Sequence, residues 1–416
     1  MTMVTGPLAA ASSSGTNRRS RIWIWLLLLL VAMSATRVIT GAHDITSAGT
    51  LQAATTAAIP IALAGLGGLW SERAGVVNIG LEGMMILGTL GAGYFGYHYG
   101  VWAGLVGAAL FGAVGGALHA LATVTFGVDH IVSGVAINII AAGVASFLAE
   151  ALFTGLPGGG PTQSPSLTRP RTVSIPGLSD WTAELADRDW FLLSDLAALV
   201  NALTARMSLF TLVALVLIFG TGWLLWKTPF GLRLRSCGES PTAAETLGVN
   251  VYRYKFIAVT MSGVFAGMGG AYLAMVASSG YANGQTNGRG YIGLAAMIFG
   301  NWRPGGLLTG SLLFGYTDAA SLRRGGESVH ALLLIVAVGL VLMAMWQVFK
   351  GARLAAALSL TVGVLALAWY LSVDTIPGHF TAMTPYVATL LVLALASQQL
   401  RMPAADGLRY TRGQAG

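Results

Sequence analysis

The sequence predicts an all-α protein, a polytopic bundle of transmembrane helices. Three observations support this fold class: 55% of the 416 residues are hydrophobic, only 9% are charged, and the mean hydropathy is +0.71. Soluble domains carry roughly 25% charged residues, so this chain is predicted to lie in a membrane. Its 56 glycines favour close approach between helices and therefore a tightly packed bundle.

The net charge of +7 does not indicate nucleic-acid binding. The basic residues occur in short clusters between apolar runs, where Lys and Arg set membrane topology. A single cysteine, Cys237, excludes an internal disulfide and a cysteine metal site, and no pair of histidines has metal-ligand spacing. We therefore expect no metal, no other cofactor and no nucleic-acid partner.

Apolar runs long enough for a spanning helix, roughly 20 residues, recur along the chain. Residues 1–21 are predicted to be a disordered cytoplasmic tail, residues 22–400 the membrane domain, and residues 401–416 a second cytoplasmic tail. The first run, Ile22–Ile39, fits a signal anchor better than a cleavable signal peptide, because the downstream chain is membrane-embedded. The other runs are Leu51–Trp70, Asn78–Tyr99, Val101–Phe126, Ile131–Phe153, Met207–Trp226, Phe256–Ser278, Tyr291–Phe299, Gly305–Ser321, Val329–Phe349, Leu354–Leu371 and Met383–Gln398.

The positive-inside rule gives these runs a consistent orientation. If the two short runs around Asn301 each cross, there are about twelve crossings and both termini are cytoplasmic. The loop 227–255 then lies inside, and the polar stretch 154–206 is an extracytoplasmic insertion that either caps the bundle or docks a partner. Arg323 and Arg324 fall outside, against the rule, unless they cap a helix or the two short runs form a re-entrant hairpin.

Two glycine-interrupted segments, residues 65–83 and 288–306, break the helical pattern. Irregular backbone at membrane depth persists only where it is buried in protein or lines a wet cavity, and matching interruptions in two halves of a transporter point to its pathway. Polar groups near these breaks therefore either shape the pathway or fix the fold, for example by pairing Glu72 or Glu82 with Arg73 or Arg303. The pathway candidates are Glu72, Arg73, Asn78, Glu82, Asn138, Asn301 and Arg303.

A short helix is predicted within the loop 227–255, from Glu239 to Gly248. Ser240 has the N-cap position, Pro241 the first helical position, and Gly248 the terminating position. So short a helix is marginal alone in water, which favours docking, either in the groove of an ATPase or at the membrane interface. The predicted ATPase-coupling positions are Glu239, Ser240, Pro241, Ala243, Ala244 and Gly248. The chain contains no Gly-Lys dipeptide and hence no P-loop, so a partner subunit must bind any ATP.

The residues Glu72-Arg-Ala-Gly-Val-Val-Asn-Ile-Gly-Leu-Glu-Gly-Met-Met85 resemble the signature of ABC permeases for nucleosides and simple sugars, within a wider group that includes ribose and branched-chain amino-acid permeases. The resemblance covers most of residues 54–410, including 131–138, 227–251, 288–302, 385–391 and 403–407. It implies a fold like that of the vitamin B12 type of importer, with about ten core helices. The pair of runs at 329–371 and the long stretch 154–206 depart from the family pattern.

The resemblance also implies partners and a location. The chain would be a multi-pass permease of a bacterial inner membrane, paired with a second related permease, identical or different. It would bind a double-length ABC ATPase through Glu239–Gly248 and receive a nucleoside or simple sugar from an extracytoplasmic binding lipoprotein. The family signature does not identify the residues that contact solute.

Two other classes of membrane protein fit the sequence less well. An ion-coupled secondary transporter would need intramembrane acids, for which Glu72 and Glu82 are candidates, but it would leave the coupling loop without a purpose. An intramembrane enzyme would need His, Ser or Asp partners at catalytic spacing, which these two acids lack. We therefore expect a transport subunit without enzymatic activity.

Overall fold

The computed structural model describes residues 15–323, 325–381, 383–385, 387, 390 and 400–413. The predicted final span, Met383–Gln398, lies largely outside these residues, as do Arg324 and most of the predicted N-terminal tail. The described chain is all-α, as predicted, apart from one antiparallel pair of two-residue strands, β1 (Thr172–Val173) and β2 (Met207–Ser208).

Seven of the described helices are long and apolar enough to cross a membrane, which confirms the polytopic character. The prediction of about twelve crossings also counted the run 383–398, the run in α1 (Gly15–Thr40), of which Leu27–Thr40 is a shorter apolar stretch, and three helices that fall below this criterion, α3 (Leu81–Tyr99), α12 (Arg289–Phe299) and α13 (Pro304–Leu322). The seven are α2 (Ala48–Arg73), α4 with the π-helical turn η2 (Val101–Thr125), α5 (His130–Phe153), α8 (Leu209–Lys227), α11 with the π-helical turn η3 (Val251–Ala277), α14 (Gly325–Phe349) and α15 (Arg353–Ser372).

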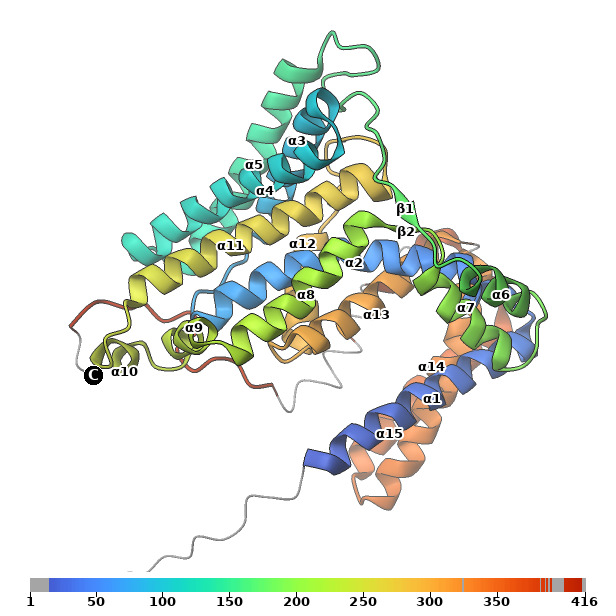
Figure 1. The fold of residues 1–416 in the computed structure, drawn as a ribbon. Helices are drawn as coiled ribbons and strands as arrows, with labels where there is room; N and C mark the ends of the chain where they lie inside the picture. The colour runs from blue at the N-terminus through green and yellow to red at the C-terminus, as the bar shows by residue number, and fades with distance from the viewer. Residues whose placement is uncertain are drawn as a thin grey trace, which may run out of the picture.

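Helix α2 runs through the middle of the main bundle, where α11, α12 and α13 pack around it (Figure 1). Most of its length after Ala58 is buried, and its side chains form one core cluster with those of its neighbours. Because lipid tails are as apolar as these side chains, the bundle is held by close packing more than by the hydrophobic effect. Members of this cluster are Leu66, Leu69, Trp70, Phe265, Met297 and Phe314.

Glycines bring α4 and α11 into direct backbone contact. A Cβ atom added to Gly112 would overlap the carbonyl oxygen of Gly263, and one added to Gly116 would lie against Val259 and Gly263. The spacings Gly112–Gly116 and Gly263–Gly267 follow the small-xxx-small pattern of close helix pairs. These glycines are therefore packing faces.

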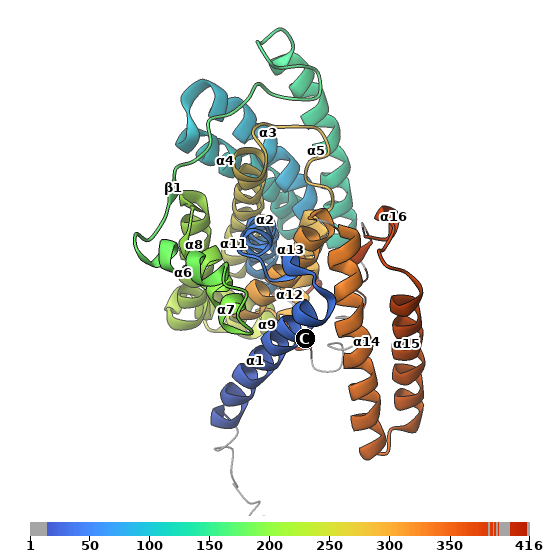
Figure 2. The ribbon, with the colours of Figure 1, turned by 90° about the vertical axis from the view of Figure 1, so that its right-hand side faces the viewer.

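Helices α1, α14 and α15 diverge from the main bundle (Figures 1 and 2). Helix α14 pairs with α15 and also contacts α1. The first of these helices begins at Gly15, so residues 15–21, predicted as part of a disordered tail, are helical. The other two are the predicted pair at 329–371, and both are largely exposed along their apolar lengths, as expected of helices that face lipid.

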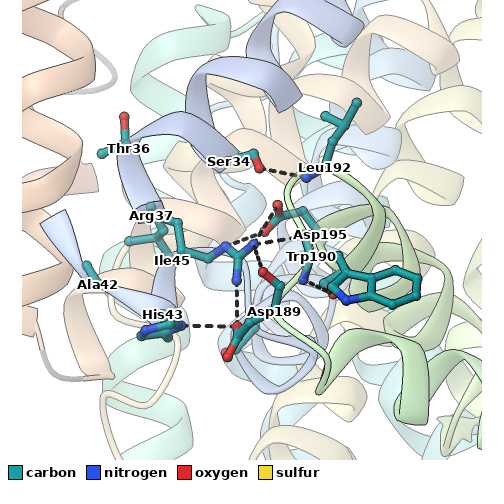
Figure 3. Close-up of polar contacts among 12 residues, drawn as sticks. Ser34, Thr36, Arg37, Ala42, His43, Ile45, Asp189, Trp190, Leu192 and Asp195 are labelled. Atoms are coloured by element: carbon teal, nitrogen blue, oxygen red, sulfur yellow. Dashed lines mark hydrogen bonds and ion pairs between the residues drawn. The ribbon is translucent and has the colours of Figure 1, made fainter. Parts of the chain in front are cut away.

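The stretch 154–206 forms a cap built on α6 (Leu178–Ala186) and α7 (Leu193–Thr204). The end of α1 is tied to it through Arg37, whose guanidinium contacts the Asp189 carboxylate at 2.5 Å and the Asp195 carboxylate at 3.1 Å (Figure 3). The side chains of Arg37 and Asp195 are 4% and 2% exposed. The backbone N–H of Leu192 also donates to Ser34 Oγ at 2.9 Å.

Near the cap, α1 continues through the short helix η1 (His43–Ile45) into α2, and α16 (Gly378–Thr381) lies beside α14. Arg323 ends α13 as its C-cap residue, with its guanidinium against Gly49 at the start of α2. The cap is made by the backbone, whose N–H donates to Ala319 O, and the charged group lies at the N-terminus of another helix. Arg323 therefore ends a helix, as one of the two explanations from the sequence requires, but its charge does not lie on the C-terminus of that helix.

Candidate translocation and coupling site

Helix α12 is a half-length helix within the second interrupted segment. Its 11 residues span about 17 Å, roughly half of a 30 Å hydrocarbon core. Gly293 in this helix packs against the backbone of Gly65 in α2, and Gly290 packs against the backbone of Glu82 in α3. The chain before the helix passes close to the cap, where Leu167 N–H donates to Ser279 O. Because Gly290 is buried, the N-terminus of α12 lies within the bundle.

Glu82 closes this N-terminus. Its carboxylate accepts hydrogen bonds from the backbone N–H of Gly288 at 2.9 Å and of Gly290 at 2.7 Å. A carboxylate is favoured here because the first N–H groups of a helix lack intrahelical partners and carry partial positive charge. Glu82 thus joins the first interrupted segment to the second.

Asn138 of α5 ties the same region to a third helix. Its Nδ2 donates to Ile79 O at 3.0 Å and to the Tyr291 hydroxyl at 2.9 Å, while its Oδ1 accepts from Gly83 N–H at 2.7 Å. The amide therefore binds both interrupted segments. Tyr291, in the first turn of α12, keeps 46% of its surface exposed.

Asn78 is fully buried in the turn between α2 and α3. It donates to Ser262 Oγ of α11 at 2.8 Å and accepts from Gly80 N–H at 3.0 Å. His119 of α4 binds the same turn, with Nε2 at 3.1 Å from Val77 O. The first break is therefore hydrogen-bonded to protein on both sides.

The inner ends of the two segments meet at Trp302. Its indole N–H donates to Glu72 Oε2 at 2.6 Å, and its carbonyl oxygen accepts from Arg73 Nη2 at 2.7 Å. Trp302 and Asn301 both have left-handed backbone angles, with φ of 51° and 56°, which non-glycine residues rarely adopt. Asn301 Oδ1 accepts from Arg401 N–H at 2.8 Å, and Arg303, the N-cap residue of α13, is exposed.

The ion pairs expected of these side chains are not formed. Among the described residues, neither Glu72 nor Glu82 makes a salt bridge with Arg73 or Arg303; Arg73 instead lies 3.7 Å from the Glu239 carboxylate. The reason is that other groups bind these side chains. The Trp302 indole N–H donates to Glu72, backbone amides at the α12 N-terminus donate to Glu82, and the Trp302 carbonyl oxygen accepts from Arg73.

The predicted coupling loop folds into two helices, α9 (Pro229–Glu239) and α10 (Pro241–Thr246). Ser240 occupies the N-cap position of α10, as predicted, although its side chain makes no capping hydrogen bond. Gly248 has a φ of +80°, as a terminating glycine requires. Ala244 is buried against Cys237 and Val251, whereas Ala243 is exposed.

Several residues of this region were not singled out by the sequence analysis. Trp302 and Asp406 lay within stretches that carried the resemblance, but neither charge nor spacing identified them as partners of Glu72. Leu247, directly after α10, is 85% exposed. In the described part of the chain, no group of three or more His, Cys, Asp or Glu side chains is placed to bind a metal ion.

A half-length helix, two hydrogen-bonded interruptions and a cluster of short helices at one end define a membrane transport protein. The family described as branched-chain amino acid transport system/permease component matches residues 50–327, and the chain belongs to this family. It is therefore the permease subunit of an ABC importer, which works with an ATPase and a binding protein. Membership also sets aside the ion-coupled carrier and agrees with a subunit that is not itself catalytic.

Three relatives cover most of the chain. It is 32% identical to the guanosine ABC transporter permease protein NupQ of Bacillus subtilis, over 86% of this chain and 94% of that protein. It is 33% identical to the nucleoside ABC transporter permease protein NupC of Lactococcus lactis, over 85% and 94%. It is 34% identical to the putative glucose ABC transporter permease protein TsgC13 of Haloferax volcanii, over 68% and 80%. No solved structure matches the chain.

Proposed function

We propose that this permease carries an uncharged nucleoside, and that a simple sugar is the second candidate. The observation that carries this proposal is the position of Glu82. In transporters with broken helices, the positive N-terminus of a half-helix faces an anionic group of the substrate. Here the chain's own carboxylate already accepts from Gly288 and Gly290 at that position.

Because the Glu82 carboxylate already accepts from the N–H groups of this N-terminus, these donors are not free to bind a solute carboxylate. An amino acid therefore fits the site less well than an uncharged polar molecule does. The names of the relatives support the same choice. NupQ and NupC are described as guanosine and nucleoside permeases and align over almost their whole length, whereas the alignment with the putative glucose permease is shorter.

Most pathway candidates serve, in this proposal, to hold the interrupted segments in shape. Glu72, Asn78 and Glu82 are buried and bonded to neighbouring protein groups. Asn138 is only half-buried, and its partner Tyr291 presents an exposed aromatic ring beside it. We expect solute contact at this pair, since an aromatic face can stack on a nucleobase.

The remaining assignments concern the assembly. The permease has the helix arrangement of the vitamin B12 type, pairs with a second related permease in a bacterial inner membrane, and has both termini in the cytoplasm. A double-length ATPase binds α10, and an extracytoplasmic lipoprotein delivers the solute. The exposed surface of α10 supports the docking of the ATPase. Ala243 and Leu247 are exposed there, at the same end of the bundle as residues 401–413.

Uptake of radiolabelled guanosine and glucose into cells tests the solute. The strains are a deletion of this gene, the same strain complemented, and a strain whose partner ATPase is inactivated. Guanosine uptake lost in the deletion and ATPase-dead strains, with glucose uptake unchanged, is the expected result. If only glucose uptake is lost, the solute is a simple sugar and not a nucleoside.

A further inference from the structure

Residues 401–413, which we name the C-terminal strap, lie against several separate parts of the inner end of the protein. The strap begins at the second interrupted segment, where Arg401 N–H donates to Asn301 Oδ1 at 2.8 Å. It then reaches the end of α9, where Ala405 N–H donates to Gly238 O at 2.8 Å and Ala404 N–H to the Glu239 carboxylate at 3.3 Å. The strap therefore connects a pathway break to the coupling loop.

The middle of the strap inserts Asp406 beside the first interrupted segment. Its carboxyl group is 8% exposed and faces Glu72, with Arg73 and Lys255 also close enough to influence it. The carbonyl oxygen of the preceding Ala405 lies against Gly75, where a side chain would crowd it.

The far end of the strap contacts α10 and the start of α11. The Tyr410 ring lies 5.3 Å from the Tyr252 ring and packs on the cluster that contains Ala244. Arg412 lies 3.4 Å from the Glu245 carboxylate, and Gly413 N–H donates to the same group at 3.4 Å. An isolated six-residue helix is unstable in water, so these contacts help to hold α10 in place.

We propose that the C-terminal strap is a positioning element that transmits displacement of α10 to the two interrupted segments. The end of α9 touches Arg73 directly, and the strap supplies a second route, from Glu245 and Ala244 through Tyr410 and Asp406 to Glu72 and Asn301. Coupling travels through contiguous packed and hydrogen-bonded groups, which this route provides. The inference rests on the proposed role of α10 as the ATPase-docking helix.

Transport per ATP hydrolysed is the quantity that tests it. The complex of this permease with its partner subunits is purified and placed in proteoliposomes, and guanosine uptake and ATP hydrolysis are measured in parallel. The variants are a truncation after Gly407 and Tyr410→Ala, with Tyr410→Phe, which keeps the ring, as the rescue. We expect the truncation and Tyr410→Ala to lower the transport-to-ATP ratio at least tenfold while hydrolysis stays within twofold, and Tyr410→Phe to restore the ratio.

Unchanged ratios in both variants, or uptake and hydrolysis that fall in the same proportion, would overturn the strap proposal. Should the truncated protein not assemble, Tyr410→Ala alone decides. Failure of the proposed function would look different, because the unmodified complex would then show no ATP-dependent uptake. If the unmodified complex couples uptake to ATP hydrolysis and the variants behave like it, only the strap proposal is wrong.

Discussion

Trp302 donates its indole N–H to the carboxylate of Glu72 at 2.6 Å, across 230 positions of sequence. The bond joins the inner ends of the two interrupted segments at a point where Glu72 is 3% exposed. A buried acid that loses its donor carries the full cost of desolvation. The pair therefore holds the two breaks together.

Trp302→Phe keeps an aromatic ring and removes the donor together with the second ring of the indole. We expect the free energy of unfolding of the purified protein to fall by about 1.5–3 kcal/mol. Thermal unfolding in detergent measures the change, with Trp223→Phe, at an exposed position of α8, as the matched control. Equal melting temperatures for the two variants would show that the Trp302 bond has no net effect.

Glu82→Ala removes the acceptor for two backbone N–H groups inside the bundle. We expect a loss of about 2–4 kcal/mol of stability, because one buried and one partly buried donor are left without partners, and a matching loss of uptake. Glu184→Ala, at an exposed position of the cap, serves as the control and should behave like the unmodified protein. Normal uptake and stability in Glu82→Ala would remove this residue from the site.

Ala243→Lys tests the docking surface of α10. Since Ala243 is exposed, the substitution should leave insertion and folding intact while the lysine obstructs the ATPase groove, so that uptake falls at least tenfold. Ala244 is unsuitable for this test because it is buried against Cys237. The same change at exposed Ala352 in the turn between α14 and α15 is the control, and co-purification of the ATPase is the second measurement. Retained ATPase binding by Ala243→Lys would argue against the docking assignment.

The docking of the C-terminal strap should depend on pH through Asp406. Burial raises the pKa of this carboxyl from its ordinary 3.8 to about 7, with Glu72, Arg73 and Lys255 around it. Between these two values the docked strap binds more protons than the released strap does, so raising the pH through this window weakens docking and acidification strengthens it.

Hydrogen exchange of the Ala405 amide measures this dependence, after correction for the intrinsic rate. Protection should fall by up to about tenfold per pH unit within the window. In Asp406→Asn the slope should vanish. A slope that persists in that variant would assign the pH dependence to another group.

Gly112→Ala and Gly220→Ala should have opposite effects. Alanine is favoured over glycine inside a helix by about 1 kcal/mol, so Gly220→Ala, where nothing lies within contact distance, should be neutral or stabilising. At Gly112 the new methyl group meets the backbone of α11, and α4 must shift. Thermal unfolding of both variants is the measurement, and similar shifts would show that α4 and α11 are not in backbone contact.

The sequence located the interrupted segments but not the bonds that join them. Glycine clusters and intramembrane acids identified residues 65–83 and 288–306, because both signals follow from the cost of irregular backbone and charge at membrane depth. The partners of Glu72 and Glu82 were expected to be arginines, since opposite charge is visible in a sequence. The partners in the structure are an indole N–H and two backbone amides, which only the fold brings close.

Short-range signals were more reliable than long-range ones in the coupling loop. Pro241 and Gly248 mark the limits of α10 because their backbone preferences act locally. The contacts of Tyr410 and Asp406 with this region join residues more than 150 positions apart, and nothing in local composition indicates them. The substrate proposal also depends on a long-range contact, the one between Glu82 and the N-terminus of α12, which local composition does not indicate.

The ion pair between Arg37 and Asp195 has a consequence for the order in which the protein folds during synthesis. Residue 195 leaves the ribosome 158 positions after residue 37, which at about 5–20 residues per second is roughly 10–30 s later. During that interval the nascent α1 holds a guanidinium whose acidic partners do not yet exist. Its contacts with α14 must wait longer still, because α14 follows every helix that packs around α2. The first helix of the chain therefore completes its contacts in two steps, one when the cap has been synthesised and one after α14.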